Sequence, residues 1–218
     1  MKETAENLRL MREFGIDEGI SEIILSSRND PEKDQTEPES NCLFNAAPIG
    51  IIWKNDKMFL RLFPGTQTYE NLMREEYFSA NITTDSVLYA NATFYDLDAD
   101  EFSTLNFSGT IVPVLKNADR YVVFRCVNRL QTSETLIIDI EPIGFKVQTK
   151  KSGFLVNRGF SSIIEICVHL TRYEQTKDPK YIELIKHHWS LAQRCGRKRD
   201  KEALSILKKR LAGFEDEI

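Results

Sequence analysis

The hydrophobic pattern of this chain changes once, near residue 150, and this change limits the folds that the chain can adopt. Before that point, apolar runs rich in Val, Ile and Phe are separated by turn residues, as is typical of strands. After the linker KKSG at residues 150–153, apolar residues recur at helical spacing. We therefore expect a mainly β domain over residues 1–150, with a helix over residues 1–15, and a small three-helix domain over residues 151–218.

The β domain is expected to hold about six strands between residues 20 and 148, which is enough for a small barrel. Between two of the runs, residues 54–56 (KND) predict a hairpin turn of about three to four residues. The apolar runs that predict strands occupy residues 20–27, 43–53, 57–63, 77–83, 107–115, 121–130 and 135–148.

Helices are predicted where apolar residues follow helical spacing behind a capping residue. Thr68 is expected to cap a helix over residues 69–76, and Thr84 or Asp85 is expected to cap one over residues 86–92. The other predicted helices occupy residues 3–14, 159–174, 180–194 and 199–212.

The composition argues against two kinds of partner. The 218 residues carry a net charge of -4, which disfavours nonspecific nucleic-acid binding, because that binding needs a basic surface. No run of about 18 apolar residues is present to span a membrane. The charged N-terminal residues do not resemble a signal peptide. We therefore expect a cytoplasmic protein that binds neither nucleic acid nor membranes.

Cysteine and histidine residues give little indication of a metal site. The four cysteines lie far apart and form no CxxC pair, so we expect free thiols rather than disulfides or a zinc ribbon. His187 and His188 are adjacent and would point to different helix faces, while His169 follows Glu165 by four residues. A metal site would need several of these side chains to converge. Ordinary packing or surface histidines are the favoured interpretation.

The most informative stretch, residues 45–50, reads NAAPIG inside a strand-like apolar run. Proline removes a hydrogen-bond donor from the sheet, so this part of the strand is expected at an edge or bulge. The small side chains of Ala46, Ala47 and Gly50 would let a flat molecule approach the backbone. The alternative is a strand edge shaped for packing against another subunit.

A second stretch, residues 64–71 (PGTQTYEN), combines a glycine turn, two threonines and a helix start. A helix N-terminus favours anions because its first N–H groups are free and its dipole is positive there. Thr66 and Thr68 would add hydroxyl donors to a phosphate. The simpler interpretation is that Thr68 caps the helix and Thr66 belongs to the turn.

Taken together and in this order, these stretches resemble an archaeal FMN-binding split-barrel family of unknown function, which is distantly similar to flavin reductases. The resemblance rests on FNAAPIGI, FPGTQTYENL, FSANIT and NRGFSSIIEICVHLTRY, at residues 44–51, 63–72, 78–83 and 157–173. It implies a split β-barrel, a C-terminal helical domain and a homodimer that binds FMN near the subunit interface.

The resemblance also implies roles for individual residues. The isoalloxazine ring would lie along Asn45, Ala46, Ala47, Pro48, Ile49 and Gly50. The ribityl-phosphate end would be held by Gly65, Thr66, Gln67 and Thr68, with Asn81 as a further candidate. From charge alone, Arg125 or Lys146 would neutralise the phosphate.

Three functions remain open from the sequence. The first is an FMN-dependent oxidoreductase or flavin reductase that uses NAD(P)H or reduces a small acceptor. The second is a flavin-binding carrier, store or redox sensor that does not turn over. The third is a protein-interaction module that has kept the barrel and lost the cofactor. No catalytic acid or base stands out, which agrees with a cofactor that carries the chemistry itself.

Overall fold

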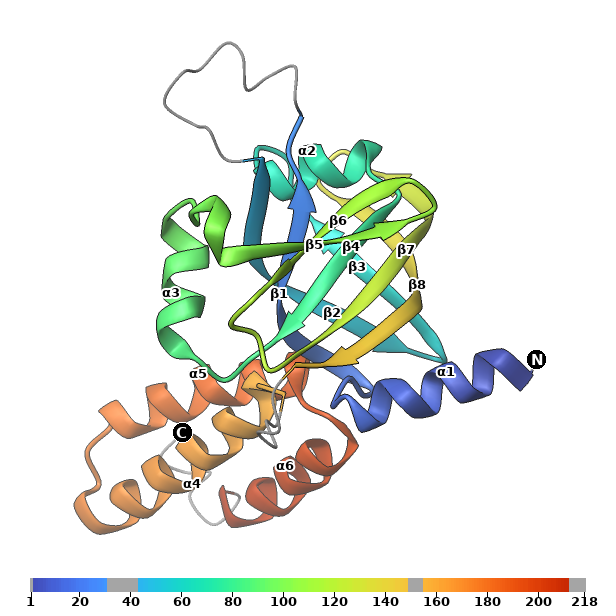
Figure 1. Ribbon diagram of the computed structural model, residues 1–218. Coiled ribbons are helices and arrows are strands. Elements are labelled where there is room, and N and C mark those ends of the chain that lie inside the picture. Colours follow the sequence, from blue (N-terminus) through green and yellow to red (C-terminus); the bar gives the residue numbers. More distant parts are fainter. Residues whose placement is uncertain (1, 31–42, 149–154, 212–218) are drawn as a thin grey trace. The chain divides into compact units, whose positions relative to one another are not determined.

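The computed structural model describes residues 2–30, 43–148 and 155–211, with side chains from Leu8 onward (Figure 1). The chain divides into two compact units. Unit 1 comprises residues 1–16 and 21–156, and unit 2 comprises residues 17–20 and 157–218. The predicted domain boundary at residue 150 lies outside the described residues.

Unit 1 is built on a closed antiparallel barrel whose strands follow the order β1-β2-β3-β8-β7-β4 (Figure 1). The barrel closes where β1 pairs with β4, with Ile24 opposite Asn81. The barrel strands are β1 (Gly19–Arg28), β2 (Phe44–Lys54), β3 (Lys57–Leu62), β4 (Tyr77–Ile82), β7 (Arg120–Gln131) and β8 (Leu136–Val147). The predicted mainly β fold with C-terminal helices is thus confirmed.

The barrel is filled by large apolar side chains that alternate along its strands. Trp53, Phe78 and Phe124 are almost fully buried, and the last two stack with ring centroids 5.4 Å apart. Helix α1 (Lys2–Glu13) adds the fully buried Met11 to this core. Full burial of one such side chain contributes roughly 1.5–3 kcal/mol, so this cluster is the main source of stability in unit 1.

The strand predicted over residues 107–115 is in fact the second half of a hairpin. Strands β5 (Phe102–Phe107) and β6 (Thr110–Leu115) form a separate two-stranded sheet. The chain turns at Ser108 and Gly109, which both have positive φ, and the Gly109 N–H donates to Asn106 Oδ1. The prediction missed β5 because its sequence, FSTLNF, is half polar.

The hairpin between β2 and β3 turns more tightly than predicted. Asn55 and Asp56 form a two-residue connection and both have positive φ, of 52° and 59°. Such a turn matches the right-handed twist of the flanking strands, and Asn and Asp tolerate it well.

Two short helices flank the start of β2. In α2 (Gln67–Arg74), the N-cap is Thr66, whose Oγ1 accepts the Tyr69 N–H at 3.2 Å; the prediction that Thr68 is the cap is wrong. Helix α3 (Ser86–Phe94) is capped by Asp85, one of the two predicted residues. A 3-10 turn at Ala99–Glu101 leads into β5.

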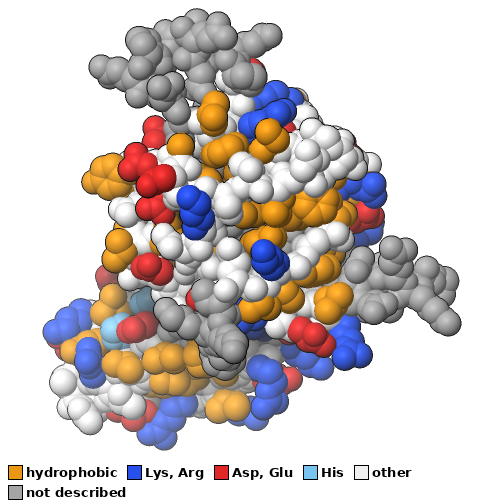
Figure 2. Space-filling model, in the orientation of Figure 1, with side chains coloured by type: hydrophobic (Ala, Val, Ile, Leu, Met, Phe, Trp, Pro, Cys, Tyr) orange, Lys and Arg blue, Asp and Glu red, His pale blue; other side chains and the backbone are white. Residues whose placement is uncertain are grey.

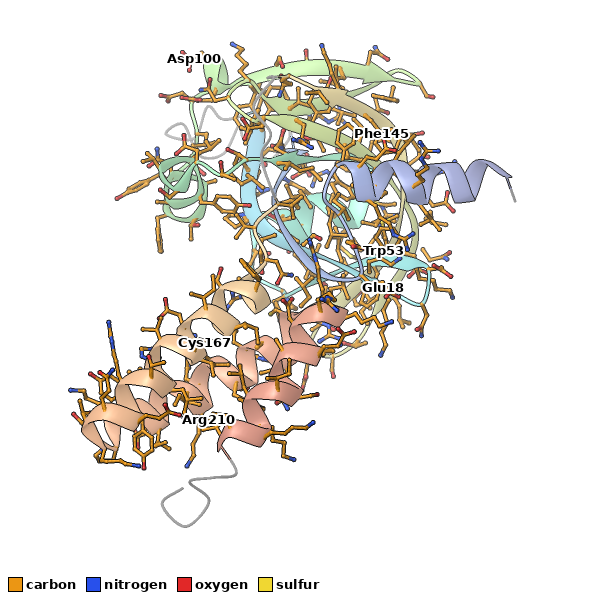
Figure 3. The ribbon with its side chains drawn as sticks, turned by 90° about the horizontal axis from the view of Figure 1, so that it is seen from below. Glu18, Trp53, Asp100, Phe145, Cys167 and Arg210 are labelled. Carbon is orange, nitrogen blue, oxygen red and sulfur yellow. The ribbon has the colours of Figure 1, made fainter. Side chains whose placement is uncertain are left out.

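Unit 2 contains three helices, as predicted: α4 (Arg158–Thr176), α5 (Lys180–Cys195) and α6 (Lys198–Leu211). Ile166, Leu170 and Ile185 lie in its core. Arg210 of α6, labelled in Figure 3, pairs with Glu174 of α4 at 2.6 Å. No helix in the described part of the chain is long and apolar enough to cross a membrane.

Unit 2 also includes residues 17–20, of which the last two are the first residues of β1. The Asn157 side chain caps α4 by accepting the Phe160 N–H at 2.9 Å. Its amide group donates to the Ile20 carbonyl at 2.8 Å and to the Cys195 carbonyl at 3.1 Å. One buried side chain therefore joins the starts of β1 and α4 to the end of α5.

Candidate functional site

A cavity of about 270 Å³ opens in unit 1 where the start of β2, the start of α2 and the end of α3 meet. Five predicted site residues lie together in its lining. The lining residues are Phe44, Asn45, Ala46, Ala47, Gln67, Thr68, Ala92, Thr93, Phe94, Tyr95, Asp96 and Leu97.

The two predicted stretches are joined inside this cavity by a hydrogen bond. Asn45 Nδ2 on β2 donates to Thr68 Oγ1 on α2 at 2.9 Å. Thr68 is only 2 % exposed, and its hydroxyl makes no other hydrogen bond to residues that the structure describes. Since the oxygen already accepts, the hydroxyl proton is available to a ligand.

The N-terminus of α2 presents backbone donors at the same place. The N–H groups of Gln67 and Thr68 are the first two of the helix and have no acceptor among the described residues. The preceding Gly65 has a φ of 84° and open space around its Cα. Free N–H groups at a helix start, with the positive end of the dipole, favour a negatively charged ligand.

The two threonines have different roles in this structure. Thr66 is exposed, and its hydroxyl is occupied, because it donates to the Phe63 carbonyl and accepts the Tyr69 N–H. Thr66 and Gly65 do not line the cavity, although they shape the turn beside it. Thr68 is therefore the threonine with a hydroxyl proton free to reach a ligand.

Beyond its first turn, α2 is fixed by polar contacts with neighbouring parts of unit 1. Buried Asn71 donates to Ser27 Oγ and Asn29 Oδ1, both at 2.9 Å. Arg129 on β7 donates to the carbonyls of Leu72 and Glu75, at 2.7 and 2.6 Å. A cation at the end of a helix also opposes the negative end of its dipole. These contacts hold the N-terminus of α2 in place.

Only some of the small residues of β2 line the cavity. Ala46 is buried against Leu88 and Ala92 of α3, whereas Ala47 is half-buried. The register of β2 with β3 covers Ile52–Lys54 and does not reach Pro48. Like Pro48, the other two predicted residues of this stretch, Ile49 and Gly50, lie outside the cavity lining.

The segment at the end of α3 and just after it lines one side of the cavity, which the sequence did not predict. Thr93 to Leu97 line the cavity, and among them Phe94 and Tyr95 are 78 % and 71 % exposed. Two adjacent aromatic residues at the end of a predicted helix are a signal in the sequence, but their link to residues 45 and 68 depends on the fold. Exposed aromatic faces are suited to stacking against a flat ligand.

Asn81 is a structural residue, and it does not reach the cavity. It is fully buried, and its amide group donates to the Ile24 carbonyl, Ser26 Oγ and Ser79 Oγ. Its oxygen accepts the Leu115 N–H at 2.8 Å. A buried amide must satisfy its polar atoms, and here they tie β4 to β1 and β6.

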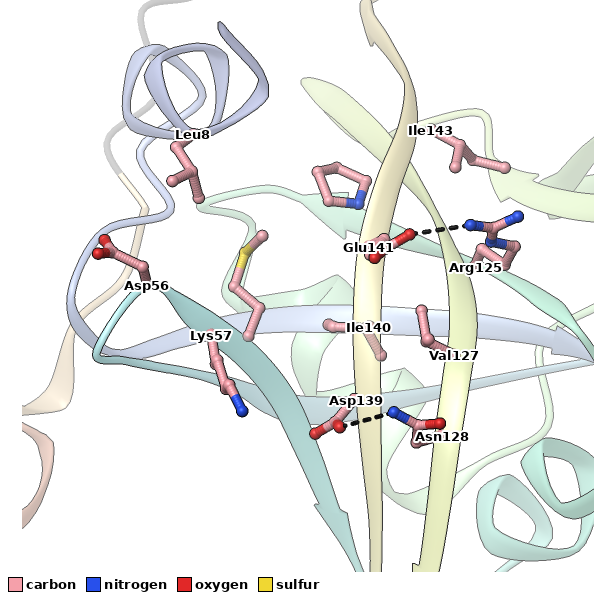
Figure 4. Close-up of a pocket in the computed structure, with 12 residues that line it drawn as sticks. Leu8, Asp56, Lys57, Arg125, Val127, Asn128, Asp139, Ile140, Glu141 and Ile143 are labelled. Carbon is pink, nitrogen blue, oxygen red and sulfur yellow. Dashed lines mark hydrogen bonds and ion pairs between the residues drawn. The ribbon is translucent and has the colours of Figure 1, made fainter. Parts of the chain in front are cut away.

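The two basic residues chosen from charge alone also lie elsewhere. Arg125 lines a second cavity, of about 730 Å³, on the outer face of β7 and β8 (Figure 4). Its guanidinium pairs with Glu141 at 2.9 Å, and this hydrogen bond raises the pKa of Arg125. Lys146 is exposed on β8, opposite Tyr121. Neither residue lines the cavity that contains Thr68.

The second cavity is larger, but its charged and polar side chains pair with one another. Asn128 donates to Asp139 at 3.2 Å beside the pair of Arg125 and Glu141 (Figure 4). Asp56 and Lys57 add one charge of each sign. With its acids and bases close together, this cavity has no excess of positive charge to hold a phosphate.

The fold and the smaller cavity define a class of protein: a six-stranded antiparallel barrel with a cavity between small strand residues and a helix N-terminus. The sequence matches the N-terminal domain of the protein family of unknown function DUF447 over residues 36–149. It matches the second DUF447 domain over residues 157–209. The chain therefore belongs to the DUF447 family.

Two relatives place the chain more closely. The FMN-bound protein MM1853 from Methanosarcina mazei, a DUF447 protein of known structure, is 38% identical to this chain. The alignment covers 91% of this chain and 98% of that one, with a TM-score of 0.56. The uncharacterized protein MJ1453 from Methanocaldococcus jannaschii is 25% identical over 207 residues, or 88% of this chain and 98% of that protein.

Proposed function

We propose that the chain binds FMN in the cavity between β2, α2 and α3. The observation that carries this proposal is the pairing of Asn45 with Thr68, which leaves a hydroxyl proton and two N–H groups for an anion. The FMN-bound relative MM1853 supports the choice of ligand.

The residues of the cavity fit the parts of FMN. Small Ala47 and exposed Phe94 and Tyr95 offer a slot with aromatic edges for a flat ring. Gln67 and Thr68 offer donors to the phosphate. A few placed polar groups that fix the orientation of a ligand are typical of cofactor sites. The remaining residues of the stretches, Pro48 to Gly50 and Gly65 to Thr66, would shape the strand and turn around the cofactor.

The proposed activity is that of an FMN-dependent oxidoreductase or flavin reductase-like protein that uses NAD(P)H or a small acceptor. Bound FMN supplies hydride or single-electron chemistry. The chain's own residues bind the phosphate, orient the ring and set its polar surroundings. This reading needs no acid or base from the protein and is compatible with a cytoplasmic protein.

We also propose that the chain forms a homodimer through the outer face of the barrel. Leu130, 62 % exposed, and Val127, 41 % exposed, lie on β7, and Ile143, 37 % exposed, lies on β8. Figure 2 shows apolar side chains gathered among polar ones on the barrel. Apolar residues gathered on neighbouring strands are typical of an interface.

The flavin proposal is tested by purification and by one substitution. The purified protein should be yellow and should release one equivalent of FMN on denaturation. Thr68→Val removes the hydroxyl and keeps the side-chain shape. Loss of one hydrogen bond to a charged group costs about 1.5–3 kcal/mol, so FMN affinity measured by fluorescence titration should fall about 10- to 150-fold.

Thr84→Val is the matched control, because Thr84 is exposed in the same unit and does not line the cavity. Equal FMN affinity in the Thr68 and Thr84 variants would reject this phosphate assignment.

Anaerobic NADH or NADPH should bleach the yellow protein if it is an oxidoreductase. A yellow protein that is not bleached would indicate a carrier or redox sensor, and a protein that takes up no FMN would indicate an interaction module.

A further inference from the structure

Three metal-ligating side chains converge in unit 2, on residues that the proposed flavin cavity does not use. Glu165 and His169 lie one turn apart on α4 and therefore share a face. His188 joins them from α5. One ligand atom from each of the three lies within 4.8 Å of those from the other two. The expectation of unrelated histidines did not foresee this convergence, which depends on the packing of α5 against α4.

Some polar atoms of this cluster have no hydrogen-bond partner among the described residues. His169 is only 8 % exposed, and the Nδ1 atoms of His169 and His188 are buried without a hydrogen-bond partner among the described residues. His169 Nε2 lies 3.6 Å from Glu165 Oε2, which is longer than a hydrogen bond. Buried polar atoms without hydrogen-bond partners lower the stability of the fold, so a bound ligand that pairs with them would explain the cluster.

Ring contacts hold the imidazole of His169 in place. The ring of Tyr181 stacks on His169 with centroids 6.0 Å apart. The ring of His188 lies on the same imidazole, with centroids 5.7 Å apart.

We propose that Glu165, His169 and His188 form a site for a divalent transition-metal ion of the Zn²⁺ type. Two imidazoles and one carboxylate suit Zn²⁺, and three protein ligands leave a fourth position for water. Bonds of about 2.1 Å in a tetrahedral site place the ligand atoms about 3.4 Å apart. Ligand atoms that lie within 4.8 Å of one another would therefore move closer by at most about 1.4 Å.

Such a site has two consequences for unit 2. The ion would bridge α4 and α5 within unit 2 and so stabilise this pair of helices. The solvent-exposed carboxylate of Glu165 gives the ion a route of entry. Histidine and acidic side chains are visible on the surface of the helical unit in Figure 2.

The proposal is tested with tag-free, metal-stripped protein and Zn²⁺ alone. The wild-type chain should bind one equivalent of Zn²⁺, measured by competition with a coloured chelator, and its melting temperature should rise with added Zn²⁺. Glu165→Gln and His188→Gln each remove a ligand at a position that is not fully buried, so both variants should fold. Each should bind Zn²⁺ at least tenfold more weakly.

His187→Gln is the matched control, because His187 is an exposed neighbour of His188 on α5 and lies outside the cluster. Its affinity for Zn²⁺ should equal that of the wild-type chain. Cys167→Ser should also leave binding unchanged, since this exposed thiol on α4 is not a ligand (Figure 3). The proposal is overturned by a wild-type chain that takes up no equivalent of Zn²⁺, or by ligand variants that bind as tightly as the His187 control. Thr68→Val should not alter Zn²⁺ binding, so this test and the flavin test fail independently.

Discussion

At the residue scale, neighbouring positions on β2 and α2 have different roles. Ala46 is buried in a cluster with Leu88 and Ala92, whereas Ala47 is half-buried at the cavity. Thr66 uses its hydroxyl to cap α2, whereas Thr68 keeps its proton available. A substitution one or two positions away can therefore change stability where its neighbour changes binding.

The two alanines provide a direct test of this difference. Ala47→Phe should fill the cavity and weaken FMN binding at least tenfold, with little change in the free energy of unfolding. Ala46→Phe should overpack the cluster around α3 and lower that free energy by about 1–3 kcal/mol. Flavin titration and urea unfolding of both variants measure the two effects. Normal FMN binding by Ala47→Phe would place the ring elsewhere.

The sequence predicted the composition of the site better than the role of each residue. NAAPIG and PGTQT were recognised as a pair, and the structure brings Asn45 next to Thr68. The cap at Thr66 and the internal bonds of Asn81 were missed, because each depends on which backbone groups lie nearby in the fold. Charge alone gave Arg125, but the charge of Arg125 is already paired with Glu141.

At the element scale, α4 begins against the end of α5. A Cβ added at Gly159 would lie 2.3 Å from the Gly196 Cα and 2.5 Å from its nitrogen. Both atoms belong to the backbone, so no side chain can move aside to relieve the contact. Glycine is therefore required at Gly159 for a close approach rather than for an unusual φ.

Gly159→Ala should lower the free energy of unfolding of unit 2 by roughly 2–4 kcal/mol. Ser161→Ala, on the exposed side of the same turn, should change it by less than about 0.5 kcal/mol. Trp189 on α5 reports on this unit, and in a Trp53→Phe background it is the only tryptophan of the chain. Urea unfolding followed by its fluorescence compares the two variants. Similar unfolding curves would show that the helix starts elsewhere or moves freely.

The elements most easily predicted from the sequence are those with a continuous pattern. Apolar runs gave β7 and β8, and helical spacing gave α4, α5 and α6. The half-polar β5 was missed, because a strand with little buried surface has no clear period. The approach of His188 to His169 was also missed, since spacing within one helix says nothing about its neighbour.

At the scale of the whole molecule, the exposed apolar residues of β7 and β8 need an explanation. A double variant, Val127→Glu with Leu130→Glu, places two charges on the face proposed for the homodimer. Light scattering after gel filtration should give twice the mass of the chain for the wild type and the mass of one chain for the variant.

Ile206→Glu is the control for this prediction, because Ile206 is 70 % exposed on α6 and lies outside the barrel. It should remain dimeric. A wild-type chain that elutes as a monomer would reject the proposed homodimer. The exposed face would then be available to a different partner.

The hydrogen bond from Asn157 to Ile20 spans 137 residues of sequence and has a consequence for biosynthesis. Ile20 leaves the ribosome early, but its carbonyl receives this partner only after the whole barrel sequence has been made. The helical unit is therefore completed last and across a discontinuous stretch of chain. A fragment cut near residue 150 would carry the three helices without Ile20, the residue to which Asn157 anchors them.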